Sequence, residues 1–168
     1  MDKEKIRIAI YVRKSTYSNF SVEPYEEVAK CKRDATKRYA DKQITFVEYI
    51  DVHYPEMIKG RLKGINKLVD DIRNGRINVI YTYSICELVG NAVELKAFLD
   101  LILKMGIEFV SLDEYPIDTH NAVFTVMRVC VDTIARIETK HEEERRHNAD
   151  INDSRKIQKG IIRRRSLL

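Results

Sequence analysis

Cysteine and histidine are scarce in this sequence, and neither is arranged as a disulfide framework or a metal site. The three cysteines, Cys31, Cys86 and Cys130, are odd in number and widely spaced, whereas disulfide scaffolds and zinc sites use cysteines at short, paired spacings. The four histidines, at positions 53, 120, 141 and 147, do not stand at metal-ligand spacing with a cysteine or a pair of carboxylates. We therefore predict no metal site.

Long apolar runs and glycine-rich loops are also missing. No stretch reaches the roughly 18 apolar residues that suggest a membrane-spanning helix, and the N-terminus MDKEKIRIAI lacks the cleavage site of a signal peptide. The sequence therefore predicts a cytoplasmic protein. Only six glycines are present, and no glycine-rich phosphate loop follows the first apolar segment. This disfavours a flavodoxin-like domain for a small phosphate compound.

Apolar strand patterns alternate with amphipathic helix patterns over the first two thirds of the chain. The 168 residues are 44% hydrophobic, which is enough for one domain with a real core. The patterns predict strands over 6–15, 44–50, 78–83 and 107–112, and helices over 23–39, 62–74 and 91–105. This order predicts an α/β fold whose mostly parallel sheet is flanked by helices.

From Ala122 the pattern becomes that of one very long helix, which we expect to run to about Gly160. Its first half carries an apolar stripe with a period near 3.5 residues, formed by Val123, Val126, Met127, Cys130, Ile134 and Ile137. Such a stripe is equally typical of a helix packed on its own sheet and of a dimer seam. We predict an α/β core over 1–121, a long helix over 122–160 and a basic tail over 161–168, without a separate C-terminal DNA-binding domain.

The end of the chain is strongly basic although the net charge is only +4. Its last fourteen residues contain no acid and six basic residues, Arg155, Lys156, Lys159, Arg163, Arg164 and Arg165. We expect this arm, together with Arg145 and Arg146 earlier on the helix, to contact DNA phosphates. The alternative is a tail that is merely solvated.

Arg13 and Ser15 follow the apolar part of the first predicted strand. Ligands of open α/β sheets bind outside the carboxyl ends of the strands, so the segment after Val12 is where a site is expected. Ser15 is the candidate reactive group, with Arg13 beside it. The plain alternative is that Ser15 forms a turn or caps a helix.

Several motifs together resemble the N-terminal catalytic domain of the serine recombinases, the family of resolvases, invertases and larger integrases. Residues 11–15, YVRKS, match the family's Y-x-R-x-S, and residues 49–51, YID, stand before its mobile loop. Residues 60–65, GRLKGI, occupy its D-R-P-G-L position. Further matches are FVSL at 109–112, PIDT at 116–119 and ARIE at 135–138, so the resemblance covers nearly the entire chain.

The resemblance implies a sheet of four parallel strands with an extra antiparallel strand, and a long helix that dimerises and then contacts DNA. In that family a serine attacks a DNA phosphate and forms a transient phosphoserine bond without a metal or a cofactor. By position, Ser15 is the nucleophile, and Arg13 and Arg61 bind the phosphate. Guanidinium groups suit this role because their planar fork meets two phosphate oxygens at once.

The sequence departs from the family at D-R-L-S-R, the motif that follows the third strand. The matching residues 86–90 read CELVG, so Cys86 replaces the aspartate, while Glu87 and Gly90 replace two phosphate-binding arginines. No arginine lies between Arg76 and Arg128. On the long helix, Thr139 stands where the family has an arginine. Loss of one transition-state arginine costs phosphoryl transfer on the order of a thousandfold in rate.

Two interpretations follow from this combination. In the first, the chain is a non-catalytic relative that forms a homodimer, or pairs with a recombinase, and touches DNA or modulates that partner. In the second, it is an active recombinase that uses Ser15 and obtains its arginines elsewhere, for example from Arg128 or from a partner subunit. Without an added DNA-binding module, we expect DNA contact to be weak, dominated by phosphates and sensitive to salt.

Overall fold

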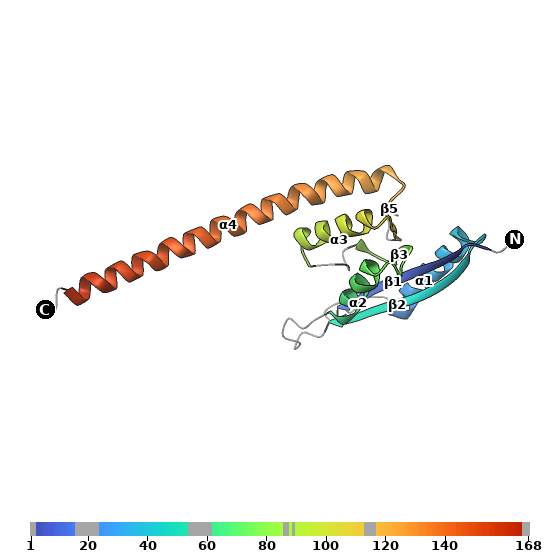
Figure 1. The fold of residues 1–168 in the computed structure, drawn as a ribbon, viewed down its shortest axis with the longest axis horizontal. Helices are drawn as coiled ribbons and strands as arrows, with labels where there is room; N and C mark the ends of the chain where they lie inside the picture. Colours follow the sequence, from blue (N-terminus) through green and yellow to red (C-terminus); the bar gives the residue numbers. More distant parts are fainter. Residues whose placement is uncertain are drawn as a thin grey trace.

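The computed structural model describes residues 3–15, 24–53, 62–85, 88, 90–112 and 117–165, with residues 14, 15, 52, 53 and 150–165 described by their backbone alone. Within these ranges, strands and helices alternate as the apolar patterns predict (Figure 1). The elements are β1 (Lys5–Ser15), α1 (Pro24–Arg38), β2 (Gln43–His53), α2 (Lys63–Arg73), β3 (Val79–Thr82), α3 (Ala92–Lys104), β4 (Glu108–Ser111), β5 (Ile117–Asp118) and α4 (Ala122–Arg165).

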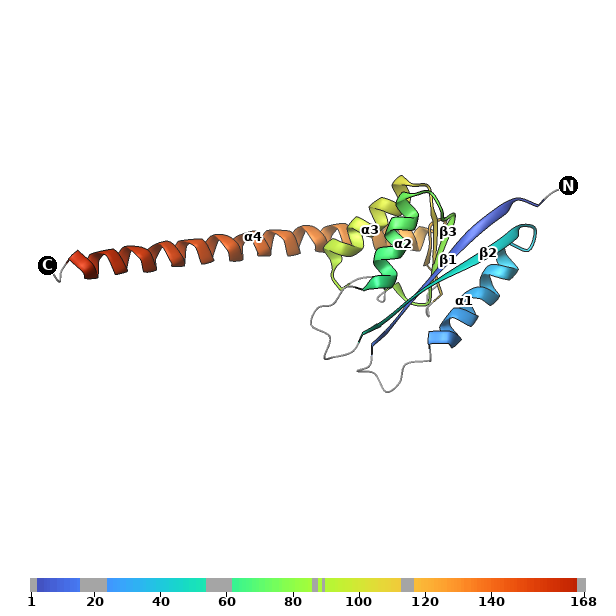
Figure 2. The ribbon, with the colours of Figure 1, turned by 60° about the horizontal axis from the view of Figure 1, so that its bottom comes forward.

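The strands form one sheet in the order β2-β1-β3-β4-β5. β1 to β4 are parallel, and only β5 is antiparallel to its neighbour β4. α1 covers one face of the sheet, and α2 and α3 cover the other, with α4 outside α3 (Figure 2). The predicted α/β fold with a mostly parallel sheet of four to five strands is confirmed.

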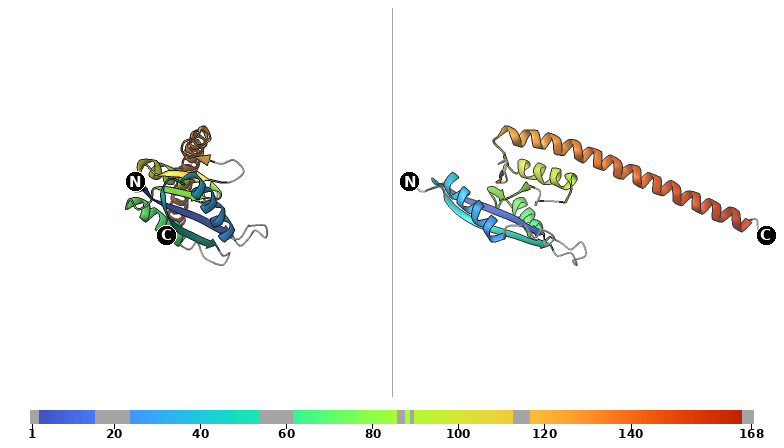
Figure 3. Two further views of the ribbon diagram at one scale, coloured as in Figure 1. Left: turned by 90° about the vertical axis from the view of Figure 1, so that its right-hand side faces the viewer. Right: turned by 180° about the vertical axis from the view of Figure 1, so that it is seen from behind.

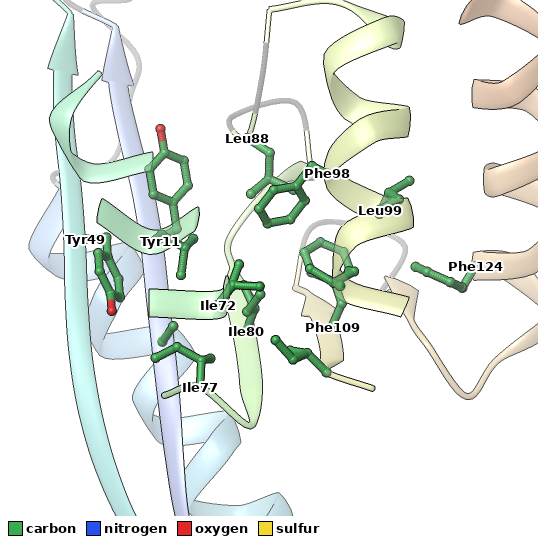
Figure 4. Packing of buried hydrophobic residues seen from close by; sticks show 14 of the residues in the cluster. Tyr11, Tyr49, Ile72, Ile77, Ile80, Leu88, Phe98, Leu99, Phe109 and Phe124 are labelled. Carbon is green, nitrogen blue, oxygen red and sulfur yellow. The ribbon is translucent and has the colours of Figure 1, made fainter. Parts of the chain in front are cut away.

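Alternation along the central strand β1 supplies both hydrophobic layers. Ile8, Ile10 and Val12 face α1, whereas Ala9 and Tyr11 face α2 and α3. In the second layer, aromatic and aliphatic side chains from the sheet, α2 and α3 pack together with the first turn of α4 (Figure 4). Each such fully buried side chain contributes about 1.5–3 kcal/mol to the stability of the fold relative to an exposed one. This packing holds the strands, and with them the carboxyl edge of the sheet, in place.

β1 continues past the apolar run that ends at Val12 up to its predicted end at Ser15, and β2 extends beyond its predicted range of 44–50. They pair residue by residue up to the rung that joins Ser15 to His53, whereas β1 pairs with β3 only as far as Tyr11. Arg13 and Ser15 therefore lie in the last part of a strand, not in a loop after Val12. Asp51, expected at the start of a loop, also lies in strand β2. The two strands satisfy each other's backbone hydrogen bonds, so pairing continues after the side chains become polar.

α4 begins on the far side of α3 and runs well past the sheet (Figure 3). Phe124, Val131 and Ala135 are buried, which fixes the first turns of the helix to the core. The helix continues to Arg165 rather than ending near Gly160, so residues 161–165 of the predicted tail are helical. Within the described ranges, no helix has the length and apolar character needed to cross a membrane.

A polar cluster joins α1 to the turn that starts α4. One guanidinium nitrogen of Arg38, Nη1, lies 2.7 Å from Asp118 Oδ2 and 3.3 Å from Glu108 Oε1. The other Asp118 oxygen accepts a hydrogen bond from the His120 backbone N–H at 2.6 Å. Partial burial tends to raise the pKa of Asp118, but the hydrogen bonds from Arg38 and His120 outweigh it and hold the pKa below its usual value.

Replacing Asp118 with asparagine is expected to lower the free energy of unfolding by about 1 kcal/mol at pH 7. The lowered pKa means that the ionised carboxylate stabilises the fold above the ordinary aspartate pKa, and that this stabilisation is lost as the pH falls through and below that value. Urea titrations at pH 7 and pH 3 should therefore show the gap between wild type and Asp118→Asn narrowing at pH 3. The exposed Asp100→Asn is the control, and a gap that is equal at both pH values would contradict this role for Asp118.

Candidate functional site

The carboxyl edge of the sheet brings Arg13 next to Asp51. The two residues are register partners on β1 and β2, and Arg13 is half-buried. The backbone of Ser15 lies two rungs further on, opposite His53. The expected neighbourhood of Arg13 and Ser15 at this edge is therefore present in the backbone, although the Ser15 side chain lies outside the described atoms.

The Asp51 carboxylate is the best-defined polar group at this edge. It is only 6% exposed and accepts three hydrogen bonds, from Tyr11 Oη at 3.1 Å and from the backbone N–H groups of Gly64 and Ile65 at 2.8 and 2.9 Å. The cap residue of α2, Leu62, makes no side-chain cap of its own. Asp51 thus caps α2 from the neighbouring strand and compensates the positive end of its helix dipole.

Gly64 makes this cap possible. A Cβ added at Gly64 would lie about 3.0 Å from the Asp51 carboxylate, which is closer than side chains normally approach. The cap fixes the start of α2, and Arg61 is joined to that start through Leu62. The motif match at 49–51 identified Asp51 but not its cap, for which the signals were the glycine at position 64 and the absence of a capping residue before the helix.

Several predicted site residues lie outside the described residues, whereas the structure describes Gly90 and Thr139. Arg61, Cys86 and Glu87 are in the first group, so their arrangement around Ser15 stays a prediction. Gly90 is exposed, and its backbone N–H lies 3.4 Å from Glu94 Oε2. Thr139 donates its hydroxyl to the backbone carbonyl of Ala135 at 2.8 Å, so this hydroxyl is used within the helix.

α3 and α4 run in opposite directions. The start of α3 therefore lies beside residues 138–146 of α4. Asn91 caps α3 by accepting the N–H of Glu94 at 2.8 Å. Beside this cap, α3 and residues 138–146 of α4 line a groove of about 590 Å³. Arg128 lines a different hollow, against Lys96 and Leu99 further along α3. Arg128 therefore lines the hollow beside Lys96 and Leu99, and not the groove beside the Asn91 cap.

The predicted apolar stripe of α4 divides into two faces. Met127 is half-buried against the core, on the same side as the buried Phe124 and Val131. The remaining members are solvent-exposed, with Val123, Val126, Ile134 and Ile137 between 48% and 63% exposed and Cys130 beside them. α4 therefore both packs on its own domain and presents a second apolar face. The two interpretations of the stripe describe different sides of one helix.

The predicted DNA-contacting residues of α4 begin with two arginines in ion pairs. Arg145 Nη2 lies 2.8 Å from Glu142 Oε2, and Arg146 Nε lies 3.4 Å from Glu142 Oε1. The basic residues at 155, 156, 159, 163, 164 and 165 stand on the helical backbone beyond them. Across the described part of the chain, no three histidine, cysteine or acidic side chains gather in a way that could hold a metal ion.

Comparisons with known proteins agree with this architecture. A family model described as the resolvase N-terminal domain matches residues 8–156. A resolvase family site-specific recombinase from Streptococcus pneumoniae has a TM-score of 0.63 at 22% identity, over 89% of this chain and 99% of that one. The N-terminal catalytic domain of TP901-1 integrase has a TM-score of 0.60 at 22% identity, over 81% of this chain and 98% of that one.

A search of curated protein sequences finds no significant match. The two solved structures share the fold of this chain, and the family match spans both the sheet and most of α4. The chain has the serine recombinase fold and belongs to the resolvase family.

Proposed function

We propose that this chain is a DNA-associated member of its family whose strand-cleaving chemistry is impaired, and that it acts as a dimer or together with an active recombinase. The observation that carries the proposal is the replacement of two family arginines by Glu87 and Gly90, in the loop that follows β3. That loop leaves the same edge of the sheet at which β1 presents Arg13 and Ser15.

Charge at this edge decides between impaired and full activity. Phosphoryl transfer depends on cations that hold the charge of the equatorial oxygens. A glutamate about 5 Å from a phosphate is instead repelled by roughly 3 kcal/mol at an effective dielectric of 20. Arg128, the nearest arginine that follows in the sequence, lies on α4 and lines a separate hollow beside Lys96 and Leu99 of α3. Loss of catalysis with retention of the scaffold is the simplest account.

The exposed face of α4 supports the proposed second subunit. Val123, Val126, Ile134 and Ile137 are about half-exposed or more and follow one another along the helix. Contiguous exposed apolar side chains of this kind mark protein interaction sites in soluble proteins. A homodimer is the simplest partner, and an active recombinase of the same family would present a helix of the same kind.

A covalent trapping assay tests the impaired chemistry. The protein is incubated with a pool of randomised duplexes containing a nick that prevents religation, and SDS-resistant protein–DNA adducts are counted. We expect no adduct above that of Ser15→Ala, because the missing arginines cost on the order of a thousandfold each. Glu87→Arg/Gly90→Arg, which restores both cations, is the gain-of-function comparison.

The same assay distinguishes the impaired chain from the alternative, in which the chain is an active recombinase that uses Ser15. A wild-type adduct that disappears in both Ser15→Ala and Arg61→Ala would overturn the impairment. DNA association is measured independently, by electrophoretic mobility shift at about 50 mM salt with the same duplexes, where phosphate contacts are strongest. Absence of any shift would reject the proposed DNA association.

A further inference from the structure

Glu142 bridges two of the arginines that α4 offers to DNA. Its two carboxylate oxygens are divided between them, with Oε2 at 2.8 Å from Arg145 and Oε1 at 3.4 Å from Arg146. These are i,i+3 and i,i+4 contacts on one helix, the spacings at which opposite charges meet. Both guanidinium groups are thereby turned toward a carboxylate of the same helix.

These three residues line the groove between α4 and the start of α3. The groove also contains Glu94, Glu138 and Glu143, so its charged side chains are four glutamates and two arginines. An excess of glutamate repels a phosphate backbone, and the two arginines are the only strongly basic side chains among the lining residues. Whether DNA is accepted here depends on how available those arginines are.

The groove is connected through the chain to the carboxyl edge of the sheet, because Asn91 stands at the end of the segment that follows β3. Asn91, which lines it, directly follows Gly90, one of the two positions that lost an arginine. The basic arm extends from the other end of the groove along the same helix (Figure 1). A backbone contact in this groove would therefore connect the edge that carries Arg13 with the basic arm.

We propose that Glu142 sets the affinity of this groove for DNA phosphates by competing with them for Arg145 and Arg146. The inference rests on the proposed DNA association and adds the residue that limits it. A phosphate that enters must take the place of the Glu142 carboxylate on both guanidinium groups. Exposed ion pairs of this kind are weak and exchange readily, so Glu142 weakens DNA binding without preventing it.

Neutralising Glu142 tests the competition in the 168-residue chain. Glu142→Gln keeps the length and helix preference of the side chain but frees both arginines. DNA affinity is measured with a duplex of random sequence over a range of salt concentrations. We expect binding about tenfold tighter at 50 mM salt and a slope of log affinity against log salt that is steeper by about one to two, since each added phosphate contact contributes about 0.9.

Glu144→Gln is the matched control. It removes the same charge two positions away on the same helix, and Glu144 lies 4.0 Å from Lys140 instead of contacting either arginine. We expect a smaller gain in affinity and an unchanged slope, because only the net charge differs. Adding Arg145→Ala and Arg146→Ala to Glu142→Gln should remove the gain.

Failure of this inference differs visibly from failure of the proposed function. If wild type binds DNA and Glu142→Gln behaves like Glu144→Gln in both affinity and slope, the competition is refuted while the DNA association stands. If neither wild type nor any variant binds, both are refuted.

Discussion

Replacing Ile134 with glutamate is expected to convert a dimer of this chain into a monomer. Ile134 is 48% exposed in the middle of the apolar face that also contains Val126, Cys130 and Ile137. If this face is the seam, the substitution places an unpaired charge in a desolvated interface. Penalties of this kind reach several kcal/mol, so the dissociation constant should rise at least a hundredfold.

Light scattering coupled to size-exclusion chromatography measures the change directly. Val129→Glu is the control, because Val129 is also exposed, at 63%, but lies about 140° around the helix from Ile134. We expect Val129→Glu to remain dimeric and Ile134→Glu to elute as a monomer with an unchanged circular dichroism spectrum. A wild-type monomer at micromolar concentration would contradict the homodimer and favour a partner recombinase.

Replacing Asp51 with alanine is expected to lower the free energy of unfolding by about 3 kcal/mol. The substitution leaves the buried Tyr11 hydroxyl and the N–H groups of Gly64 and Ile65 without their acceptor. Each unsatisfied buried group costs about 1–3 kcal/mol, and a lost helix cap typically costs about 1 kcal/mol. Part of this loss is recovered because the N–H groups of Gly64 and Ile65 are only part-buried and water can reach them.

Urea denaturation followed by circular dichroism measures this loss, with Asp70→Ala as the control. Asp70 is 72% exposed on the same helix and makes one ion pair at 4.0 Å with Arg73, so its replacement should change stability by less than about 0.5 kcal/mol. Asp51→Asn retains one acceptor oxygen and should fall between the two. Equal stability of Asp51→Ala and Asp70→Ala would show that the cap does not hold α2.

The order of strands and helices could be predicted because apolar periodicity is a local property of the sequence. The end of β2 could not, because it depends on pairing with β1 between residues such as Arg13 and Asp51 that lie far apart in the chain. The side chains at the paired strand ends are mostly polar, so the pattern stops while the backbone ladder continues. The expected antiparallel fifth strand, which rests on the family resemblance, is confirmed as β5.

The candidate site was predictable to different degrees. The edge that carries Arg13 and Ser15 follows from the sheet topology, whereas the cap formed by Asp51 joins residues 13, 14 and 40 positions apart and leaves no periodic signal. On α4, Met127 and Ile134 lie only about 20° apart around the helix, and the 3.5-residue repeat could not show that Met127 packs against the core while Ile134 is 48% exposed. Glu142 and Arg145 are only three residues apart on one helix, so their ion pair could have been predicted from the sequence.

Because α4 is packed on the core near its start, a small rotation of the helix there produces a large displacement of its far end. Among its residues up to 149, whose side chains are described, the last buried one is Ala135, and the helix continues to Arg165, which is about 45 Å further at 1.5 Å per residue. A tilt of about 10° at Ala135 would move the far end by roughly 8 Å, more than the roughly 6 Å width of a minor groove. Small packing changes around Phe124 are therefore magnified at the basic end of the chain.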